Sequence, residues 1–292
     1  MDLYFFNAPF SLIPTLTFGL FGLLIGSFLN VVIHRMPKML EREFENACAE
    51  HVGKDPVHTD TYTLSVPRSA CPHCGHKITA IENVPVVSYL VLRGKCRGCK
   101  AKISVRYPII ELISGSLAAW MIWQFGSGWL GMGAVVFGFM LIAMTCIDLD
   151  TQYLPDDLTL PLMWLGLLIN LNGGFASLHD AVIGAVAGYL ILWSINALFK
   201  LVRKMDGMGG GDFKLLAALG AWMGWQMLPA IILLSSVVGA VVGITMMLVA
   251  GSGRETKIPF GPYLAGAGLL ALLFGPEIAH FTQLYLSAGA PR

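Results

Sequence analysis

The residues with the clearest capacity for chemistry are two aspartates, Asp148 and Asp212, each of which lies where a hydrophobic stretch meets a polar one. Two carboxyl groups a few ångströms apart cannot easily both ionise, so such a pair holds one proton between its members. The ionised member can take a proton from water, while the protonated member hydrogen-bonds the carbonyl under attack. If the fold brings the two residues together, they predict hydrolysis of a peptide bond by an aspartic mechanism.

The approach to Asp212 is rich in glycine, which occupies four of the five preceding positions: Gly207, Gly209, Gly210 and Gly211. The missing side chains leave one wall open, so an extended peptide can lie against this loop. Lys214 is expected either to stabilise the charge of Asp212 or to help hold the loop. An isolated aspartate in a polar loop is more often a helix cap. The glycine-rich approach, together with short helices after both aspartates, favours catalysis.

Four cysteines form a second pattern, Cys71-Pro-His-Cys74 and Cys96-Arg-Gly-Cys99, with 21 residues between the two pairs. Two C-x-x-C turns at this distance can place four thiolates on one tetrahedral zinc ion. Four protein ligands leave no open position for a catalytic water, so the predicted zinc is structural. The alternative is a thiol oxidoreductase pair, which is disfavoured because the second pair would have no redox role and a cytosolic loop is kept reduced.

The composition predicts a polytopic membrane protein, because 55% of the 292 residues are hydrophobic and only 13% are charged. The net charge of +1 gives no support to nucleic-acid binding. We expect an all-α protein with about eight transmembrane helices. The expected segments are Leu12–Ile33, Pro108–Phe125, Trp129–Ile147, Leu158–Leu171, Ala181–Phe199, Phe213–Leu228, Pro229–Ala250 and Pro259–Ala279.

Two of these segments, Leu158–Leu171 and Phe213–Leu228, are short for a membrane crossing, and re-entrant or buried helices are the alternative. Each begins just after one of the aspartates. If they cross the bilayer, water or thinned lipid must reach in at one end. The aspartate end is the expected wet end, which suits hydrolysis.

Lysine and arginine indicate the orientation, because they are enriched in cytoplasmic loops. Of the 19, twelve lie between Arg35 and Arg106. This places the His34–Arg106 loop and both aspartates on the cytoplasmic side, with the amino terminus outside. The predicted domains are therefore a first transmembrane helix (1–33), a cytosolic zinc-knuckle domain (34–106) and a transmembrane aspartic protease core (107–292). Within the loop, Glu41–Asp60 lacks a clear period and is expected to be mobile or weakly ordered.

Four groups of residues together form a recognisable pattern. They are Gly26-Ser-Phe-Leu-Asn-Val-Val-Ile-His-Arg35-Met-Pro37, the paired C-x-x-C turns, Asp148 with Leu154-Pro-Asp156, and Gly209-Gly-Gly-Asp212-Phe-Lys214. The pattern resembles the type IV prepilin leader peptidase family, which also serves type II secretion pseudopilins and belongs to the membrane aspartic proteases with a GxGD motif. The resemblance extends over nearly the whole chain.

The resemblance implies a bifunctional enzyme of the bacterial inner membrane. Such enzymes cut the short basic leader of a prepilin after a glycine at the cytoplasmic face, and then methylate the new amino group with S-adenosylmethionine. The family's catalytic aspartates match Asp148 and Asp212. The nearby acids Asp150, Asp156 and Asp157 are not chosen. The implied partners are prepilins, pseudopilins and the lipid bilayer.

One further acid, Glu111, lies about one turn into the second expected span and is a functional candidate by its depth. A structural pair with Lys102 or Arg106 is an equal alternative. No G-x-G-x-x-G unit follows a predicted strand, so a methyl-donor pocket would have to use the cytosolic domain and adjacent helix ends.

The sequence can also be compared with two other classes of membrane protein, transporters and zinc metalloproteases. Intramembrane carboxylates also occur in ion-coupled transporters, but the two halves of this chain show no convincing self-similarity. A zinc metalloprotease would need an H-E-x-x-H motif, and the sequence contains none.

Overall fold

The computed structural model describes residues 12–204, 207–250, 259–275 and 277. Over these ranges the chain is helical and contains no strand; its β-type pairing is limited to two isolated bridges in the cysteine-bearing segment. The chain divides into two compact units, residues 1–143 and 144–292. The predicted all-α class is therefore confirmed for the described part of the chain.

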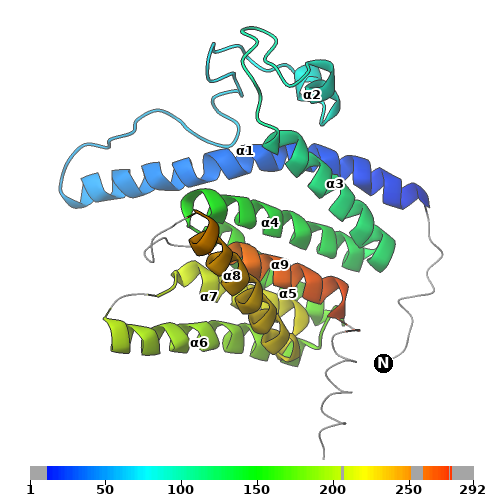
Figure 1. Ribbon diagram of the computed structural model, residues 1–292, viewed down its shortest axis with the longest axis vertical. Helices are drawn as coiled ribbons and strands as arrows, with labels where there is room; N and C mark the ends of the chain where they lie inside the picture. The colour runs from blue at the N-terminus through cyan, green and yellow to red at the C-terminus, as the bar shows by residue number, and fades with distance from the viewer. Residues whose placement is uncertain (1–11, 205–206, 251–258, 276, 278–292) are drawn as a thin grey trace, which may run out of the picture. The chain divides into compact units, whose positions relative to one another are not determined.

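The first unit is built on two long helices, α1 (Leu12–His51) and α3 (Arg106–Phe125), which run antiparallel and side by side (Figure 1). Glycines in α1 allow the close approach. A Cβ atom on Gly26 would lie 2.7 Å from Cα of Glu111, and one on Gly22 would lie 2.7 Å from Cβ of Ala118. The Gly26 motif thus serves the packing of α1 against α3.

Helix α1 is longer than the sequence predicted, because it continues through the polar residues to His51. The expectation of weak order from Glu41 to Asp60 was wrong for this part. Polar contacts replace the missing apolar period: Arg42 Nη1 lies 2.9 Å from Asp60 Oδ2, and Asn46 exchanges two hydrogen bonds with the backbone of His58. The returning loop therefore stabilises the helix that precedes it.

The loop after α1 is also fixed by Arg35, which is only 8% exposed. Its guanidinium donates to the carbonyl oxygens of Thr63, at 2.9 Å, and Pro67, at 2.6 Å, and lies against the ring of Tyr62. Two short elements follow, the 3-10 helix η2 (Ile81–Asn83) and helix α2 (Val87–Val91).

In the second unit the short helix α7 packs against most of the other helices (Figure 1). Its elements are the end of α4 (Trp129–Thr151), α5 (Asp156–Leu171), α6 (Leu178–Arg203), α7 (Gly210–Met223), η3 (Trp225–Met227), α8 (Leu228–Ala250) and α9 (Gly261–Leu273). Helix α7 is buried along nearly its whole length. It lies very close to α6, because a Cβ atom on Gly220 would be 2.2 Å from the carbonyl oxygen of Gly184.

Four described helices are long and apolar enough to cross a membrane: α1, α4, α6 and the stretch Trp225–Val249 that contains α8. They indicate a multi-pass membrane protein, while the count of eight spans stays a prediction. The two short segments form helices close to their expected bounds, as α5 and α7. Helix α7 ends earlier than expected because Gly224 takes a φ of +80° and terminates it. The expected segment Pro259–Ala279 contains α9, and its end lies outside the described residues.

Candidate active site and metal centre

The two predicted catalytic residues, Asp148 and Asp212, line one cavity of about 240 Å³ within the second unit. Both are buried, with exposed fractions of 5% and 8%. The cavity wall also includes Leu154, Asp156 and the glycine loop. The structure therefore brings together two acids that are 64 positions apart in the sequence.

Each aspartate is held at the end of a helix. Asp148 lies in the last turn of α4, just before the chain turns at Gln152 and passes through the buried Leu154 to Pro155, where α5 begins. Asp212 lies in the first turn of α7, three residues after its N-cap, Gly209. This is where unpaired backbone N–H groups favour a carboxylate.

The glycines before Asp212 have separate roles. Gly209, Gly210 and Gly211 line the cavity. A Cβ atom on Gly211 would lie 2.6 Å from Cβ of Leu154, whereas one on Gly210 would meet nothing within 4 Å. Gly211 is thus needed for packing, and Gly210 leaves space in the wall.

Gly207 does not line the cavity. It lies against Phe199, where a Cβ atom would be 2.6 Å from the ring. Its N–H and that of Met208 both donate to Oδ1 of Asn196, at 3.0 and 3.1 Å. Asn196 therefore anchors the start of the glycine loop to α6, a role that its position in an apolar helix did not reveal.

Lys214 lines the cavity, but its ammonium binds Asp156 rather than the catalytic candidate Asp212. Its Nζ donates to both carboxylate oxygens of Asp156, at 2.6 and 2.7 Å. The pair joins α7 to the start of α5 at the cavity wall. This contact is consistent with the expected role of Lys214 in holding the loop. It also means that the carboxylate of Asp156 is paired with a lysine.

A residue that the sequence analysis missed, Gly261, lies directly against Asp148. A Cβ atom at this position would be 2.6 Å from Oδ2 of Asp148 and 3.1 Å from Cδ1 of Leu154. That Oδ2 atom is buried, and the Asp148 carboxyl also interacts with the backbone of Gly261. Gly261 stands between Phe260 and Pro262, which is a turn signal, but nothing in the sequence links this turn to Asp148.

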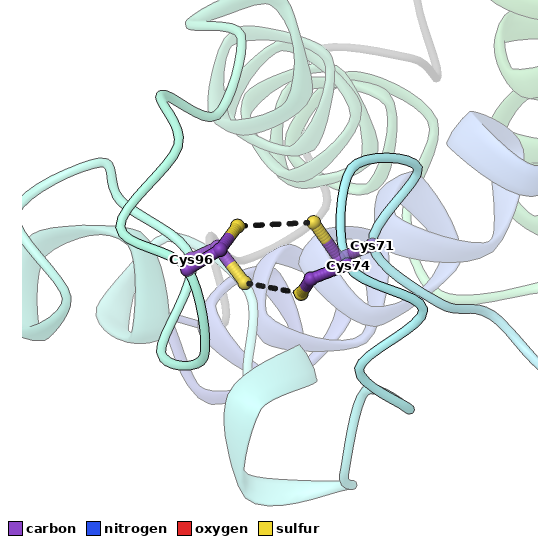
Figure 2. Close-up of side chains that lie close together, drawn as sticks. Cys71, Cys74 and Cys96 are labelled. Atoms are coloured by element: carbon purple, nitrogen blue, oxygen red, sulfur yellow. Dashed lines mark hydrogen bonds between the residues drawn. The ribbon is translucent and has the colours of Figure 1, made fainter.

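The four predicted metal ligands, Cys71, Cys74, Cys96 and Cys99, form one cluster in which all Sγ atoms lie within 4.8 Å of one another. The Sγ atoms of Cys71 and Cys99 are 3.8 Å apart, and those of Cys74 and Cys96 are 4.0 Å apart (Figure 2). Tetrahedral zinc with Zn–S bonds of about 2.3 Å requires sulfur separations of about 3.8 Å. The donor set therefore fits a closed tetrahedral metal site. Cys48 and Cys146 lie outside this cluster.

The two cysteine turns have matching backbones. The N–H of Gly75 donates to the carbonyl oxygen of Cys71, and the N–H of Lys100 donates to the carbonyl oxygen of Cys96. An isolated antiparallel bridge closes each turn. Gly75 and Lys100 both take a left-handed φ, +70° and +62°. The backbone N–H groups of His73 and Cys74 face the Cys71 thiol and lower its pKa to about 7. This favours the thiolate that a metal requires.

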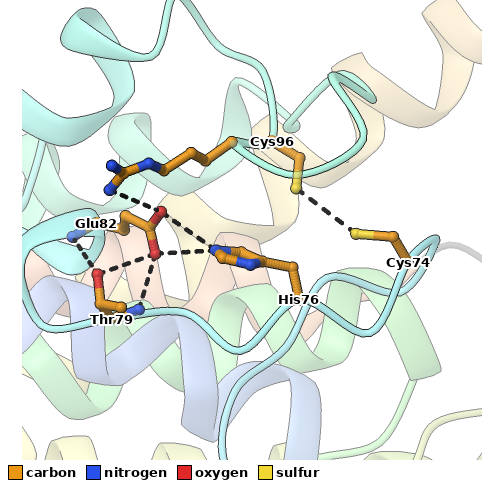
Figure 3. Close-up of polar contacts among 6 residues, drawn as sticks. Cys74, His76, Thr79, Glu82 and Cys96 are labelled. Atoms are coloured by element: carbon orange, nitrogen blue, oxygen red, sulfur yellow. Dashed lines mark hydrogen bonds and ion pairs between the residues drawn. The ribbon is translucent and has the colours of Figure 1, made fainter.

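Glu82, in η2, contacts residues beside the cysteines, as Figure 3 shows. Its carboxylate accepts hydrogen bonds from Thr79 N–H and Oγ1, both at 2.9 Å, lies 3.2 Å from Nε2 of His76, and is 3.7 Å from Nη1 of Arg97. The N–H and hydroxyl groups of Thr79 are the main reason that the pKa of Glu82 falls to about 2. His76 follows the first cysteine turn and Arg97 belongs to the second, so one charged carboxylate contacts both turns.

We expect Glu82→Ala to weaken metal binding about tenfold, because groups that orient metal ligands contribute on this scale. The measurement is competition between the purified protein and a chromophoric zinc chelator. Glu41→Ala, at an exposed acid on α1, is the matched control and should bind zinc as the parent does. Equal zinc affinity of both variants would contradict a role of Glu82 in orienting the metal ligands.

Glu111, the remaining candidate, is buried in α3 with an exposed fraction of 8%. Its Oε2 accepts a 2.7 Å hydrogen bond from the backbone N–H of Val86. Neither of the two cations proposed from the sequence is the partner in this contact. Glu111 belongs to the first unit, and both aspartates belong to the second.

Comparisons with known proteins add to this geometry. Residues 20–125 match the model of the bacterial peptidase A24 N-terminal domain, and residues 135–244 match that of the type IV leader peptidase family. A prepilin leader peptidase/N-methyltransferase of Aeromonas hydrophila is 55% identical over 280 residues, which cover 94% of this chain and 96% of the relative. The chain belongs to the type IV leader peptidase family.

Other relatives carry the same name and similar coverage. The Pseudomonas aeruginosa protein is 54% identical over 91% of both chains, and that of Burkholderia pseudomallei strain K96243 is 50% identical over 97% of this chain and 92% of its own. No solved structure matches. Within this leader peptidase, the N-terminal match contains all four clustered cysteines, and the peptidase match contains both aspartates.

Proposed function

We propose that this leader peptidase is a bifunctional membrane enzyme, a prepilin peptidase and N-methyltransferase. It cleaves type IV prepilins and type II secretion pseudopilins after a glycine, and then methylates the new amino terminus. The observation that carries the peptidase part is the shared cavity of Asp148 and Asp212 beside the glycine loop. The names of relatives at 50–55% identity support both activities.

The proposed cleavage uses the dyad with one shared proton. A peptide backbone lies along Gly209–Gly211, and the ionised aspartate takes a proton from water as the water oxygen attacks the scissile carbonyl. The protonated aspartate gives its proton to the carbonyl oxygen. On collapse, the proton taken from water passes to the leaving nitrogen, while the other carboxylate removes a proton from one hydroxyl. The carbon–nitrogen bond breaks, and the pair again holds one proton.

We assign the four cysteines to a structural zinc ion, because the closed donor set leaves no position for a reacting water. S-adenosylmethionine would supply the methyl group. We place its binding site in the 34–106 segment and adjacent helix ends, since we assign the cavity at the aspartates to the peptide substrate.

We further propose an inner-membrane location with both aspartates at the cytoplasmic face. The support is the concentration of twelve of the 19 basic residues between Arg35 and Arg106. A leader that stays in the cytoplasm would meet the aspartates on that side.

The test is incubation of the purified full-length protein with a prepilin that carries a basic leader, a glycine and a hydrophobic segment. We expect cleavage after the glycine without added metal and without S-adenosylmethionine, followed by methyl transfer to the cleaved product when the labelled donor is added. Ion-coupled solute uptake in liposomes, with the prepilin left intact, would contradict the proposal and support a transporter.

A further inference from the structure

The segment from Ile81 to Val91, between the two cysteine pairs, has an unusual surface for part of a polar loop. Positions 83–92 carry no charged residue. The one acid of the segment, Glu82, is largely buried, because its carboxylate faces Thr79, His76 and Arg97. Its large apolar side chains are exposed: Ile81 (80%), Val84 (42%), Val87 (55%), Leu90 (67%) and Val91 (75%). Uncharged apolar stretches of about this length are typical of interfacial or re-entrant membrane segments.

Two contacts fix the depth of this segment against the helices of the first unit. Asn83 Oδ1 lies 3.4 Å from Oγ of Ser27 in α1, and Val86 N–H donates to Glu111 in α3. Ser27 lies six residues before Ile33, the last residue of the apolar part of α1. At 1.5 Å per residue this is roughly 9 Å inside a helix that is long and apolar enough to cross a membrane.

Glu111 lies at the same level as Ser27, because the backbone of Gly26 packs directly against it. The helices show exposed apolar side chains around this level, including Leu24 (58%) and Phe28 (49%) on α1 and Leu112 (48%) on α3. Exposed apolar side chains therefore occur both on the 81–91 segment and on α1 and α3 at the level where Asn83 and Val86 contact these helices.

In lipid, backbone N–H and C=O groups must find hydrogen-bond partners within the protein, because no water is present. Several backbone groups of this segment have such partners. The N–H groups of Asn83, Val84, Ser88 and Leu90 donate to carbonyl groups of the same segment or of Ala80, and Pro85 has no N–H. Val86 takes a φ of +60° and ψ of −48°, which is strained for a β-branched residue. The N–H of Val86 donates a hydrogen bond to the carboxylate of Glu111.

We propose that the 81–91 segment lies in the bilayer, at the boundary between headgroups and hydrocarbon, with these five apolar side chains in contact with lipid and Glu111 as the residue that holds it there. On this proposal, part of the predicted cytosolic zinc-knuckle domain (34–106) contacts lipid. The zinc cluster is then held at the membrane surface, since Cys74 precedes the segment and Cys96 follows it.

The test uses a photo-crosslinking amino acid, p-benzoylphenylalanine, placed at Leu90 or Val91 of the full-length protein in phosphatidylcholine liposomes. Leu24, on the apolar part of α1, is the lipid-facing control, and Val57, which is 62% exposed in the polar loop, is the water-facing control. We expect lipid adducts by mass spectrometry from positions 90, 91 and 24, and none above background from 57. Adducts from 90 and 91 to a second copy of the chain or to the prepilin, without lipid, would overturn the proposal, as would their absence.

A second pair of variants tests the role of Glu111. Glu111→Gln keeps an acceptor oxygen for Val86, whereas Glu111→Leu removes it. With the crosslinker at Leu90, we expect the lipid adduct to persist in Glu111→Gln and to be lost in Glu111→Leu. The adduct from Leu24 and the zinc content, unchanged in both, report that the protein is folded. An unchanged adduct from Leu90 in Glu111→Leu would remove Glu111 from the proposal.

Discussion

Asp148→Asn and Asp212→Asn should each reduce prepilin cleavage by at least about 10²–10⁴-fold, the contribution of a positioned general acid or base. An amide can neither take a proton from water nor hold the shared proton of the dyad. Because the two side chains act as a unit, the double variant should lose little more than either single one. The measurement is the rate of leader removal by purified variants in detergent.

The controls for this prediction separate chemistry from folding. Asp157→Asn alters an exposed acid near the cavity and should cleave at close to the parent rate. Methyl transfer to a substrate that has already lost its leader should persist in Asp148→Asn and Asp212→Asn. Full cleavage by either aspartate variant would exclude that residue from the dyad.

Gly261→Ala should lower the cleavage rate about 100-fold, because an error of about 1 Å in the position of a catalytic group can cost this much. The added Cβ would lie 2.6 Å from Oδ2 of Asp148, inside van der Waals contact, so the carboxyl group or the start of α9 must move. The reaction rate at saturating prepilin reports the effect.

Gly266→Ala is the matched control, because it adds the same methyl group to the same helix where nothing lies within 4 Å. Removing a helical glycine there should stabilise α9 slightly and leave cleavage unchanged. Equal rates for Gly261→Ala and Gly266→Ala would show that the close contact with Asp148 has no catalytic consequence.

The sequence alone indicated which side chains lie together, because groups with this chemistry leave local signs. The spacing of the cysteine pairs indicated a four-sulfur cluster, and these four Sγ atoms do converge. Asp148 and Asp212 stand at the ends of apolar segments, and both line one cavity. Their catalytic roles remain predictions, which the variants above are designed to test.

The contacts that hold these groups could not be predicted, because they join residues on separate elements whose packing the sequence does not reveal. Gly261 approaches Asp148 across more than a hundred positions, and Asn196 reaches the glycine loop from the preceding helix, α6. The extension of α1 to His51 depends on bonds from the returning loop rather than on its own periodicity. Such partners become visible only when the helices are placed together.

The position of Gly261 at the start of α9 leads us to expect that the enzyme becomes competent late in its synthesis. A nascent chain that has emerged only as far as α8 already carries both acids and the glycine loop. It still lacks the backbone that packs against Asp148. If Gly261 positions Asp148 as proposed, we expect cleavage only from chains that have been synthesised at least as far as the start of α9, so that shorter nascent chains would not yet cut the membrane proteins around them.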